Sequence, residues 1–189
     1  MSKKICVFCS SSSTVPDVYV KATQELGQWI GRNGHTLIYG GSTAGMMGQL
    51  SAAVRQSGGQ CIGVIPDFLQ AAGLANIEDN ETIITDSMHL RKAKMIALAD
   101  VFIALPGGYG TLEEILEVIT LKQLQQHNKP IYLYNTNGFY DILLQLSERL
   151  IVEQFIKEVF RGLFDVVETC DNLEKMLAHY VVPVYPRKW

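Results

Sequence analysis

The feature that most restricts the fold is a junction near the middle of the chain, where an apolar stretch meets a glycine loop. Residues 101–105 read Val-Phe-Ile-Ala-Leu, an unbroken apolar run that is typical of a buried strand. The loop Pro106-Gly107-Gly108-Tyr109-Gly110-Thr111 follows, and beyond it the apolar residues take the spacing of a helix's buried face, at Leu112, Ile115, Leu116 and Ile119. A strand that passes through a short loop into a helix is typical of βα units, which build parallel sheets.

Strand and helix patterns alternate along the rest of the chain as well. Strands are expected at 4–9, 35–39, 61–65, 82–85, 101–105, 130–134 and 164–167, and helices at 16–32, 46–56, 86–99, 140–153 and 171–179, besides the one after the glycine loop. Residues 67–80 are the least regular stretch, and we expect a lid or an interface segment there. The pattern predicts one domain over residues 1–189, an α/β, doubly wound, mostly parallel sheet flanked by helices, which is a Rossmann-like fold.

Composition excludes several classes of protein. The net charge is −3 with both signs dispersed over 189 residues, so no surface for a nucleic-acid polymer is expected. Cys6 and Cys9 form a CxxC on an expected strand, where their side chains point to opposite faces, and no second pair completes a zinc site. We expect buried structural cysteines. No signal peptide and no membrane-spanning run is evident, which predicts a cytoplasmic protein without a membrane partner.

The glycine loop is expected to hold an anion, most plausibly a phosphate. It lies between the carboxyl end of a strand and the amino end of a helix, where backbone N–H groups are unpaired and the helix dipole is positive. A second glycine loop, 40–45, falls at another strand end. The turn at Ser10–Ser13 lacks the glycines of a dinucleotide fingerprint, and Met46-Met47 stand where a P-loop needs lysine and a hydroxyl. Neither a nicotinamide enzyme nor an ATPase is indicated.

Two further patterns admit more than one interpretation. Thr111-Leu112-Glu113-Glu114 fits a helix-capping box, but the preceding proline and three glycines favour a functional loop. In Met88-His89-Leu90-Arg91-Lys92-Ala93-Lys94-Met95, the basic side chains either face the strand ends or form a solvated surface. We expect solvation for Lys94, while Arg91 and Lys92 fit both interpretations equally. No His, Cys, Asp or Glu spacing suggests a metal site.

Together these two motifs resemble those of the LOG ("lonely guy") family, which are cytokinin riboside 5′-monophosphate phosphoribohydrolases. The resemblance extends to Cys6–Ser11, Tyr39-Gly40-Gly41, Gly45–Gly48 and Gly63–Pro66, and it covers most of the chain. It implies hydrolysis of the N-glycosidic bond of an adenine-type nucleoside 5′-monophosphate, giving free base and ribose 5-phosphate. It also implies a homodimer, and neither a cofactor nor a metal is expected.

The resemblance further assigns roles to single residues. It places the catalytic arginine and glutamate at Arg91 and Glu114. The positions expected to bind substrate are Met88, Lys92, Gly107, Gly108, Tyr109, Gly110, Thr111, Glu113 and Thr120, with Gly41 and Gly45 in the second glycine loop. Departures from the usual pattern at Leu90 and Lys94 leave the preferred base open, between plain AMP and an N6-modified AMP such as isopentenyl-AMP.

Two other functions remain to be weighed against hydrolysis. Carrier proteins for a phosphorylated pterin cofactor resemble the same fold and glycine loop, but they would not need a carboxylate beside the sugar. Older labels call similar sequences lysine decarboxylases, yet nothing in this chain indicates a lysine that binds pyridoxal phosphate. The presence of both Arg91 and Glu114 favours the hydrolase.

Overall fold

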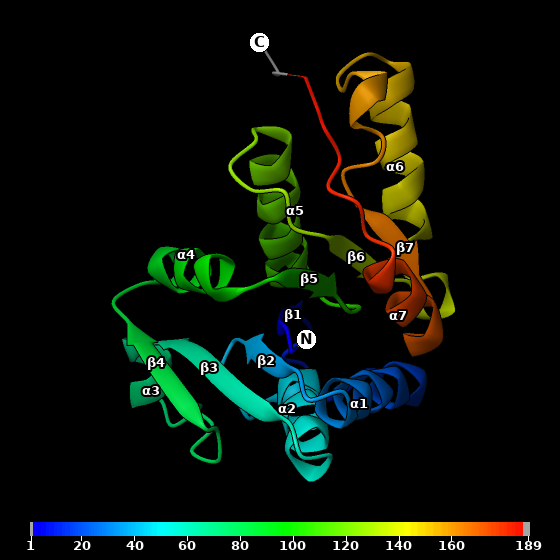
Figure 1. Cartoon of the computed structure of the whole chain (residues 1–189). Helices are drawn as coiled ribbons and strands as arrows, with labels where there is room; N and C mark the ends of the chain where they lie inside the picture. Colours follow the sequence, from blue (N-terminus) through cyan, green and yellow to red (C-terminus); the bar gives the residue numbers. More distant parts are fainter. Residues whose placement is uncertain (1, 187–189) are drawn as a thin grey trace.

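The computed structural model describes residues 2–186, and its centre is a seven-stranded sheet in which every neighbouring pair is parallel. The strands are β1 (Lys4–Phe8), β2 (Thr36–Tyr39), β3 (Gln60–Pro66), β4 (Glu81–Thr85), β5 (Val101–Ala104), β6 (Ile131–Tyr134) and β7 (Asp165–Val167). They lie in the order β4-β3-β2-β1-β5-β6-β7 (Figure 1). The direction of winding therefore reverses between β1 and β5, and a crevice is expected at the carboxyl ends of these two strands.

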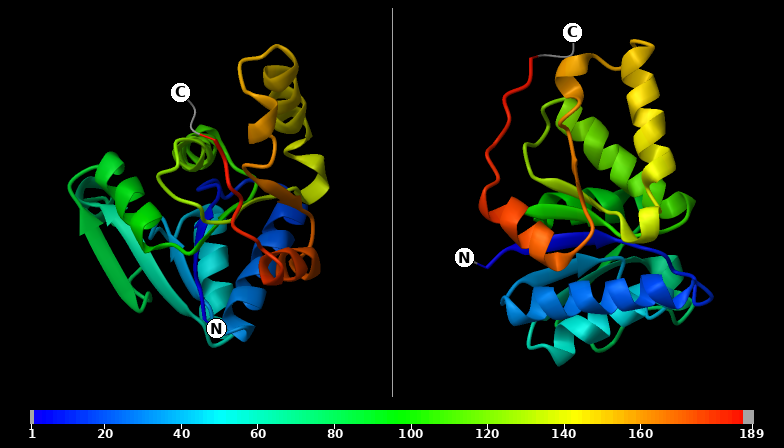
Figure 2. Two further views of the ribbon diagram at one scale, coloured as in Figure 1. Left: turned by 45° about the horizontal axis from the view of Figure 1, so that its top comes forward. Right: turned by 90° about the vertical axis from the view of Figure 1, so that its right-hand side faces the viewer.

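Helices cover both faces of the sheet (Figures 1 and 2). The first face carries α1 (Asp17–Arg32), α2 (Gly45–Gln56) and α7 (Cys170–Ala178), whereas the second carries α4 (Met88–Leu98), α5 (Tyr109–Gln123) and α6 (Asp141–Val152). Short helical segments complete the fold, namely α3 (Asp67–Ala71), η1 (Thr136–Gly138) and η2 (Glu158–Phe160). This arrangement confirms the doubly wound α/β fold that the alternating pattern predicts.

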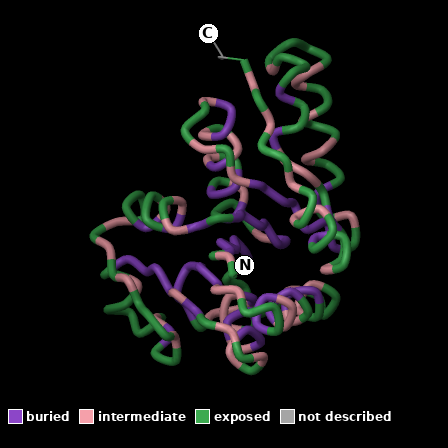
Figure 3. The backbone as a smooth tube through the Cα atoms, viewed as in Figure 1, coloured by how far each residue is buried: buried purple, intermediate pink, exposed green. Residues whose placement is uncertain are grey.

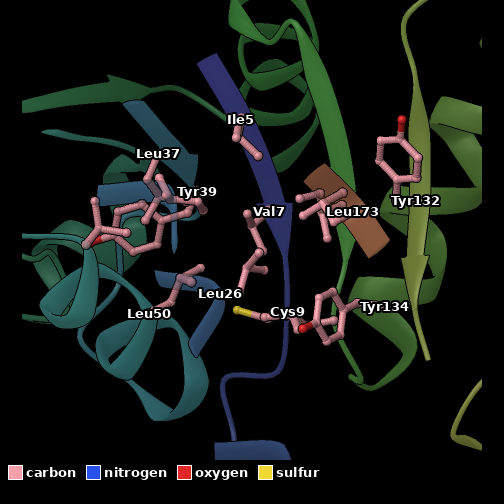
Figure 4. Close-up of a cluster of buried hydrophobic side chains, with 14 of the residues drawn as sticks. Ile5, Val7, Cys9, Leu26, Leu37, Tyr39, Leu50, Tyr132, Tyr134 and Leu173 are labelled. Carbon is pink, nitrogen blue, oxygen red and sulfur yellow. The ribbon is translucent and has the colours of Figure 1, made fainter. Parts of the chain in front are cut away.

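A separate apolar core lies on each face. Val7, Tyr39, Leu26 and Leu50 belong to the core under α1 and α2 (Figure 4). The strands at the centre of the sheet are buried along nearly their whole length (Figure 3). Their position explains why these strands read as unbroken apolar runs, since side chains on both faces of a parallel sheet are covered by helices.

The two cysteines of the CxxC lie on opposite faces, as strand geometry requires. Cys9 packs in the core under α1 and α2, and Cys6 packs in the core under α4 and α5. Burial raises the pKa of both thiols well above the ordinary value. All four cysteines are free thiols, and the expected burial of Cys6 and Cys9 is confirmed.

The elements begin and end within about two residues of the expected positions. Ser87 caps α4 by accepting a hydrogen bond from the Leu90 N–H at 3.2 Å.

The segment 67–80 is more ordered than its sequence suggests, because α3 is followed by an antiparallel bridge from Ala75 to Ser42. Within residues 2–186 no helix is long and apolar enough to cross a bilayer.

Candidate active site

A cavity of about 640 Å³ opens at the carboxyl edge of the sheet, around the point where the winding reverses. The loops after β1, β2 and β5 contribute to its walls, together with the first turns of α4 and α5. Both glycine loops therefore border the same cavity, through Gly40 and Ser42 from one and Gly108–Thr111 from the other. This is the crevice in which doubly wound proteins bind their ligands.

One wall of the cavity is the amino-terminal end of α5. Gly108 is the residue before its first turn, and among the described residues no side chain caps that turn. The first N–H groups of α5 are left for a ligand, and they point out at the positive end of the helix dipole. Thr111 is the third residue of α5 and not its cap, so the capping-box interpretation of Thr111–Glu114 is wrong.

Glu114 and Arg91 form a buried ion pair that lines the cavity. Arg91 Nη2 donates a hydrogen bond to Glu114 Oε1 at 2.7 Å, and the residues are only 8% and 6% exposed. Burial raises the pKa of Glu114 to about 7, although the charge of Arg91 lowers it. A carboxyl group with this pKa exchanges its proton near neutral pH, which is what general acid–base chemistry requires.

Arg91 keeps part of its hydrogen-bonding capacity unused. Its Nη1 donates weakly to the Met88 sulfur at 3.7 Å, while its Nε is buried with no partner in the part of the chain that the structure describes. A buried guanidinium donor without a partner costs free energy, so sites that keep one are commonly functional. This donor is consistent with a ligand or water in the cavity.

Six of the predicted binding residues lie outside the cavity lining, and three of these, Lys92, Glu113 and Thr120, belong to α4 and α5. Lys92 pairs with Glu113 and, at 2.8 Å, with Glu117, which joins α4 to α5 beside the cavity. Burial lowers the pKa of Lys92, but hydrogen bonds to Glu113 and Glu117 more than offset this and raise it overall. Thr120 is exposed and its hydroxyl donates to the Leu116 carbonyl within α5.

Of the remaining predicted residues, five line the cavity and three glycines pack behind its lining. Met88, Gly108, Tyr109, Gly110 and Thr111 line the cavity. Three glycines, Gly41, Gly45 and Gly107, lie outside the lining. Gly45, at φ +52°, lets the start of α2 contact the backbone of Ser11 and Ser12, where a Cβ atom would collide. A side chain at Gly107 would likewise collide with that of Thr111.

Several lining residues are absent from the sequence prediction. They are Cys9, Ser10, Ser11, Ser12, Gly40, Ser42, Ala44, Met47, Leu69 and Leu74. The serines follow β1 at the reversal point, so strand order would have indicated them had it been visible in the sequence. Leu69 and Leu74 come from the segment 67–80 and carry no local signal of a site.

Comparisons with known proteins fit this geometry. The family model described as "Possible lysine decarboxylase" matches residues 47–177. Cytokinin riboside 5′-monophosphate phosphoribohydrolase LOG of Oryza sativa subsp. japonica is 43% identical over 179 residues, which cover 95% of this chain and 74% of the relative. The chain belongs to the LOG family. LOG2 of Arabidopsis thaliana, with the same enzyme name, is 41% identical over 95% of this chain and 84% of its own length.

Solved structures agree with the LOG assignment at the level of the fold. The molybdenum cofactor binding protein from Rippkaea orientalis superposes with a TM-score of 0.71 over 94% of this chain and 96% of its own, at 21% identity. At that identity the likeness shows the fold alone. The LOG relatives, at about twice the identity, are therefore the better guide to the site of this chain.

Proposed function

We propose that this LOG protein hydrolyses the N-glycosidic bond of an adenine-type nucleoside 5′-monophosphate, releasing the free base and ribose 5-phosphate. The observation that carries the proposal is the buried Arg91–Glu114 pair, which faces the same cavity as the uncapped start of α5. A carboxylate beside a phosphate site weakens anion binding, so a pure binding protein would gain nothing from it. A hydrolase needs both groups.

In this proposal α5 holds the phosphate and the sugar follows along the helix. The 5′-phosphate binds the backbone N–H groups of Gly108–Thr111 and the Thr111 hydroxyl. Glu114 lies one turn further along α5, where the ribose C1′ would be. Binding energy from the phosphate is thereby used to fix the reacting carbon against the carboxylate.

Glu114 supplies the chemistry of bond cleavage. Breaking the bond from C1′ to the base builds positive charge on the ribose, as in glycoside hydrolysis. The Glu114 carboxylate stabilises this charge and removes a proton from the attacking water, whose oxygen forms the new bond to C1′. The base leaves with the electrons of the broken bond and takes up one proton, so the reaction consumes one water in all. Arg91 orients the carboxylate through the 2.7 Å hydrogen bond and offsets its repulsion from the phosphate.

The base lies toward the apolar end of the cavity. Leu69 and Leu74 follow β3, which is three strands away from β5 and its phosphate loop. At about 4.8 Å per strand, that separation is about 14 Å. An apolar substituent on the base would contact these side chains and Met47, which supports N6-alkylated AMP over plain AMP.

Product analysis by mass spectrometry tests the reaction and this preference together. We expect free base and ribose 5-phosphate from both N6-isopentenyl-AMP and AMP, with the faster rate for the prenylated nucleotide. Burial of a five-carbon chain supports a difference of at least ~10-fold in kcat/KM, since each buried CH₂ contributes about 0.8 kcal/mol. Unchanged nucleotide in every sample, with binding still measurable, would favour the carrier function instead.

We also propose that two copies of the chain associate through an apolar groove between α5 and α6. The groove has a volume of about 420 Å³ and is lined mainly by leucine, isoleucine and phenylalanine side chains, including Leu116, Ile119, Leu146, Ile151 and Phe160. On α6, Ile142 and Leu146 are 79% and 50% exposed. Exposed apolar surface of this kind commonly marks an interface, and α5 would place the partner next to the cavity.

Light scattering after gel filtration tests the dimer. Wild-type protein is expected at about twice the 21.0 kDa of one chain. Leu146→Glu places a charge in the groove and should give the monomer, because burying an unpaired carboxylate costs several kcal/mol. Val18→Glu, at an exposed position of α1 on the opposite face, is the matched control and should remain dimeric. A monomeric wild type would contradict the proposal.

We place this single-domain enzyme in the cytoplasm. Its four cysteines are free thiols, three of them buried, which suits a reducing compartment. Fractionation of cells that carry a tagged copy, with cytoplasmic and secreted markers, would test this.

A further inference from the structure

Gly40 lines the cavity, whereas Gly41 and Gly45, the other glycines of its loop, do not. It follows β2 directly, and its backbone faces the guanidinium of Arg91. A Cβ atom built at Gly40 would lie 2.8 Å from Arg91 Nη2, 3.2 Å from Arg91 Cζ and 2.9 Å from the Met47 sulfur. The corresponding atom at Gly41 would instead approach the backbone of β3.

We propose that Gly40 is a positioning residue, whose missing side chain provides the space that holds the Arg91 guanidinium against Glu114. This inference rests on the proposed hydrolase function, and it assigns a role to a residue that touches the arginine and not the reacting atoms. The resemblance to LOG proteins predicts Gly41 and Gly45 as site residues and gives no role to Gly40.

The contacts of Arg91 explain why this space matters. Nη2 is the atom that donates to Glu114, and it is also the atom closest to the position of a Gly40 side chain. Two non-bonded atoms of this size lie about 3.5 Å or more apart, so a methyl group at residue 40 would push Nη2 by roughly 0.7 Å. A movement of this size away from Glu114 lengthens the 2.7 Å hydrogen bond to about 3.4 Å, close to the limit for such a bond, and weakens it.

The same contacts show that the fold would tolerate the methyl group. The atoms in its way are the ends of two flexible side chains, Arg91 and Met47, and not backbone. Gly40 also lacks the positive φ of Gly41 and Gly45, so alanine is not strained there. The change therefore acts on the arrangement of the site and not on the stability of the sheet.

Displacing the guanidinium has a measurable electrostatic consequence at Glu114. Positive charge there comes from Arg91 and Lys92 on α4, and negative charge from Glu113 on α5. The thiols of Cys6 on β1 and of Cys9 just after it are uncharged, because burial raises their pKa values. Moving Arg91 away weakens an interaction that lowers the pKa of Glu114, so this pKa should rise above 7.

The decisive experiment compares Gly40→Ala with wild type by two independent measurements. The first is the pH titration of the Glu114 carboxyl carbon by NMR, assigned through its absence in Glu114→Gln. The second is kcat for base release. We expect a higher titration midpoint and a loss in kcat of roughly 10- to 100-fold in Gly40→Ala. Gly162→Ala is the matched control, since the one atom of residues 2–186 that a Cβ there would approach within 4 Å is the Tyr185 hydroxyl, at 3.7 Å.

The same substitution in an Arg91→Ala background separates an effect that acts through Arg91 from a direct effect on Glu114 or the substrate. In Arg91→Ala, adding Gly40→Ala should change neither the titration nor kcat further, because the arginine through which it acts on Glu114 is already gone. Additive effects in the double variant would overturn the proposal, as would an unshifted Glu114 titration in Gly40→Ala. If Gly40→Ala fails to fold because its methyl group collides with Arg91, the double variant, which lacks that side chain, should fold. Failure of both variants to fold would also refute the contact between residue 40 and Arg91. A wild type that releases no base would refute the hydrolase function alone, since the NMR titration does not depend on turnover.

Discussion

Glu114→Gln is expected to lower kcat for base release at least ~100-fold, while the affinity for nucleotide stays within a few-fold of wild type. Glutamine has nearly the volume of glutamate, and its amide oxygen can still accept the hydrogen bond from Arg91. It cannot accept a proton from water, and it carries no charge to stabilise the developing positive charge on the ribose. The loss therefore falls on the transition state and not on ground-state binding.

The measurement is best made at pH 8, where the Glu114 carboxyl of wild type is mostly ionised. Initial rates give kcat, and calorimetry with the slowly reacting variant gives Kd. Glu25→Gln is the control for removing one carboxylate, because Glu25 is exposed on α1, on the opposite face of the sheet. Turnover of Glu114→Gln within a few-fold of wild type would mean that Glu114 is not the base.

The sequence locates the proposed catalytic pair, Arg91 and Glu114, on one edge of the sheet but does not bring the two residues into contact. Both helices begin after a strand, so periodicity alone places Arg91 and Glu114 near strand carboxyl ends. Their 2.7 Å hydrogen bond depends on the order β4-β3-β2-β1-β5, which sends α4 back across the sheet to reach β5. Strand order is a long-range property and leaves no mark in local spacing.

The placement of Lys92 and Glu113 shows a second limit of sequence reasoning. Each is adjacent in sequence to a cavity residue, Arg91 or Glu114, and shares its motif. Successive residues of an α-helix point about 100° apart, so the side chains of Lys92 and Glu113 turn away from the cavity that Arg91 and Glu114 line. The two side chains turned away from the cavity meet each other instead.

The segment 67–80 shows a third limit, because its order comes from distant residues. Tyr39 donates from its hydroxyl to Asp79 Oδ2 at 2.8 Å, and Asn76 donates from its backbone N–H to the Gly41 carbonyl, also at 2.8 Å. The Thr43 N–H also donates to the Leu74 carbonyl at 3.1 Å, which holds Leu74 at the cavity. The irregular local pattern correctly predicts that the segment has no long regular element, but it does not reveal the long-range hydrogen bonds that order it.

Arg91→Ala is expected to lower kcat at pH 7 about 100-fold and to move the ionisation that controls kcat to higher pH. In wild type, activity should rise with pH through about 7, because Glu114 acts as a base only when ionised. Burial raises the pKa of Glu114, and the charge of Arg91 opposes that rise. Without the arginine the buried carboxyl holds its proton to higher pH, so less of the enzyme is active at pH 7.

The profile of kcat between pH 5.5 and 9.5 separates the two contributions of Arg91. The electrostatic part should be recovered at high pH, where Glu114 ionises even without its partner, whereas the part due to orientation should remain lost. Arg91→Lys keeps the charge but not the planar geometry, and it should restore more of the pKa than of kcat. Lys94→Ala, an exposed cation on the same helix, is the control for lost positive charge. An Arg91→Ala profile with the wild-type midpoint would contradict the electrostatic role, because a buried carboxyl that loses its cationic partner must bind its proton more tightly.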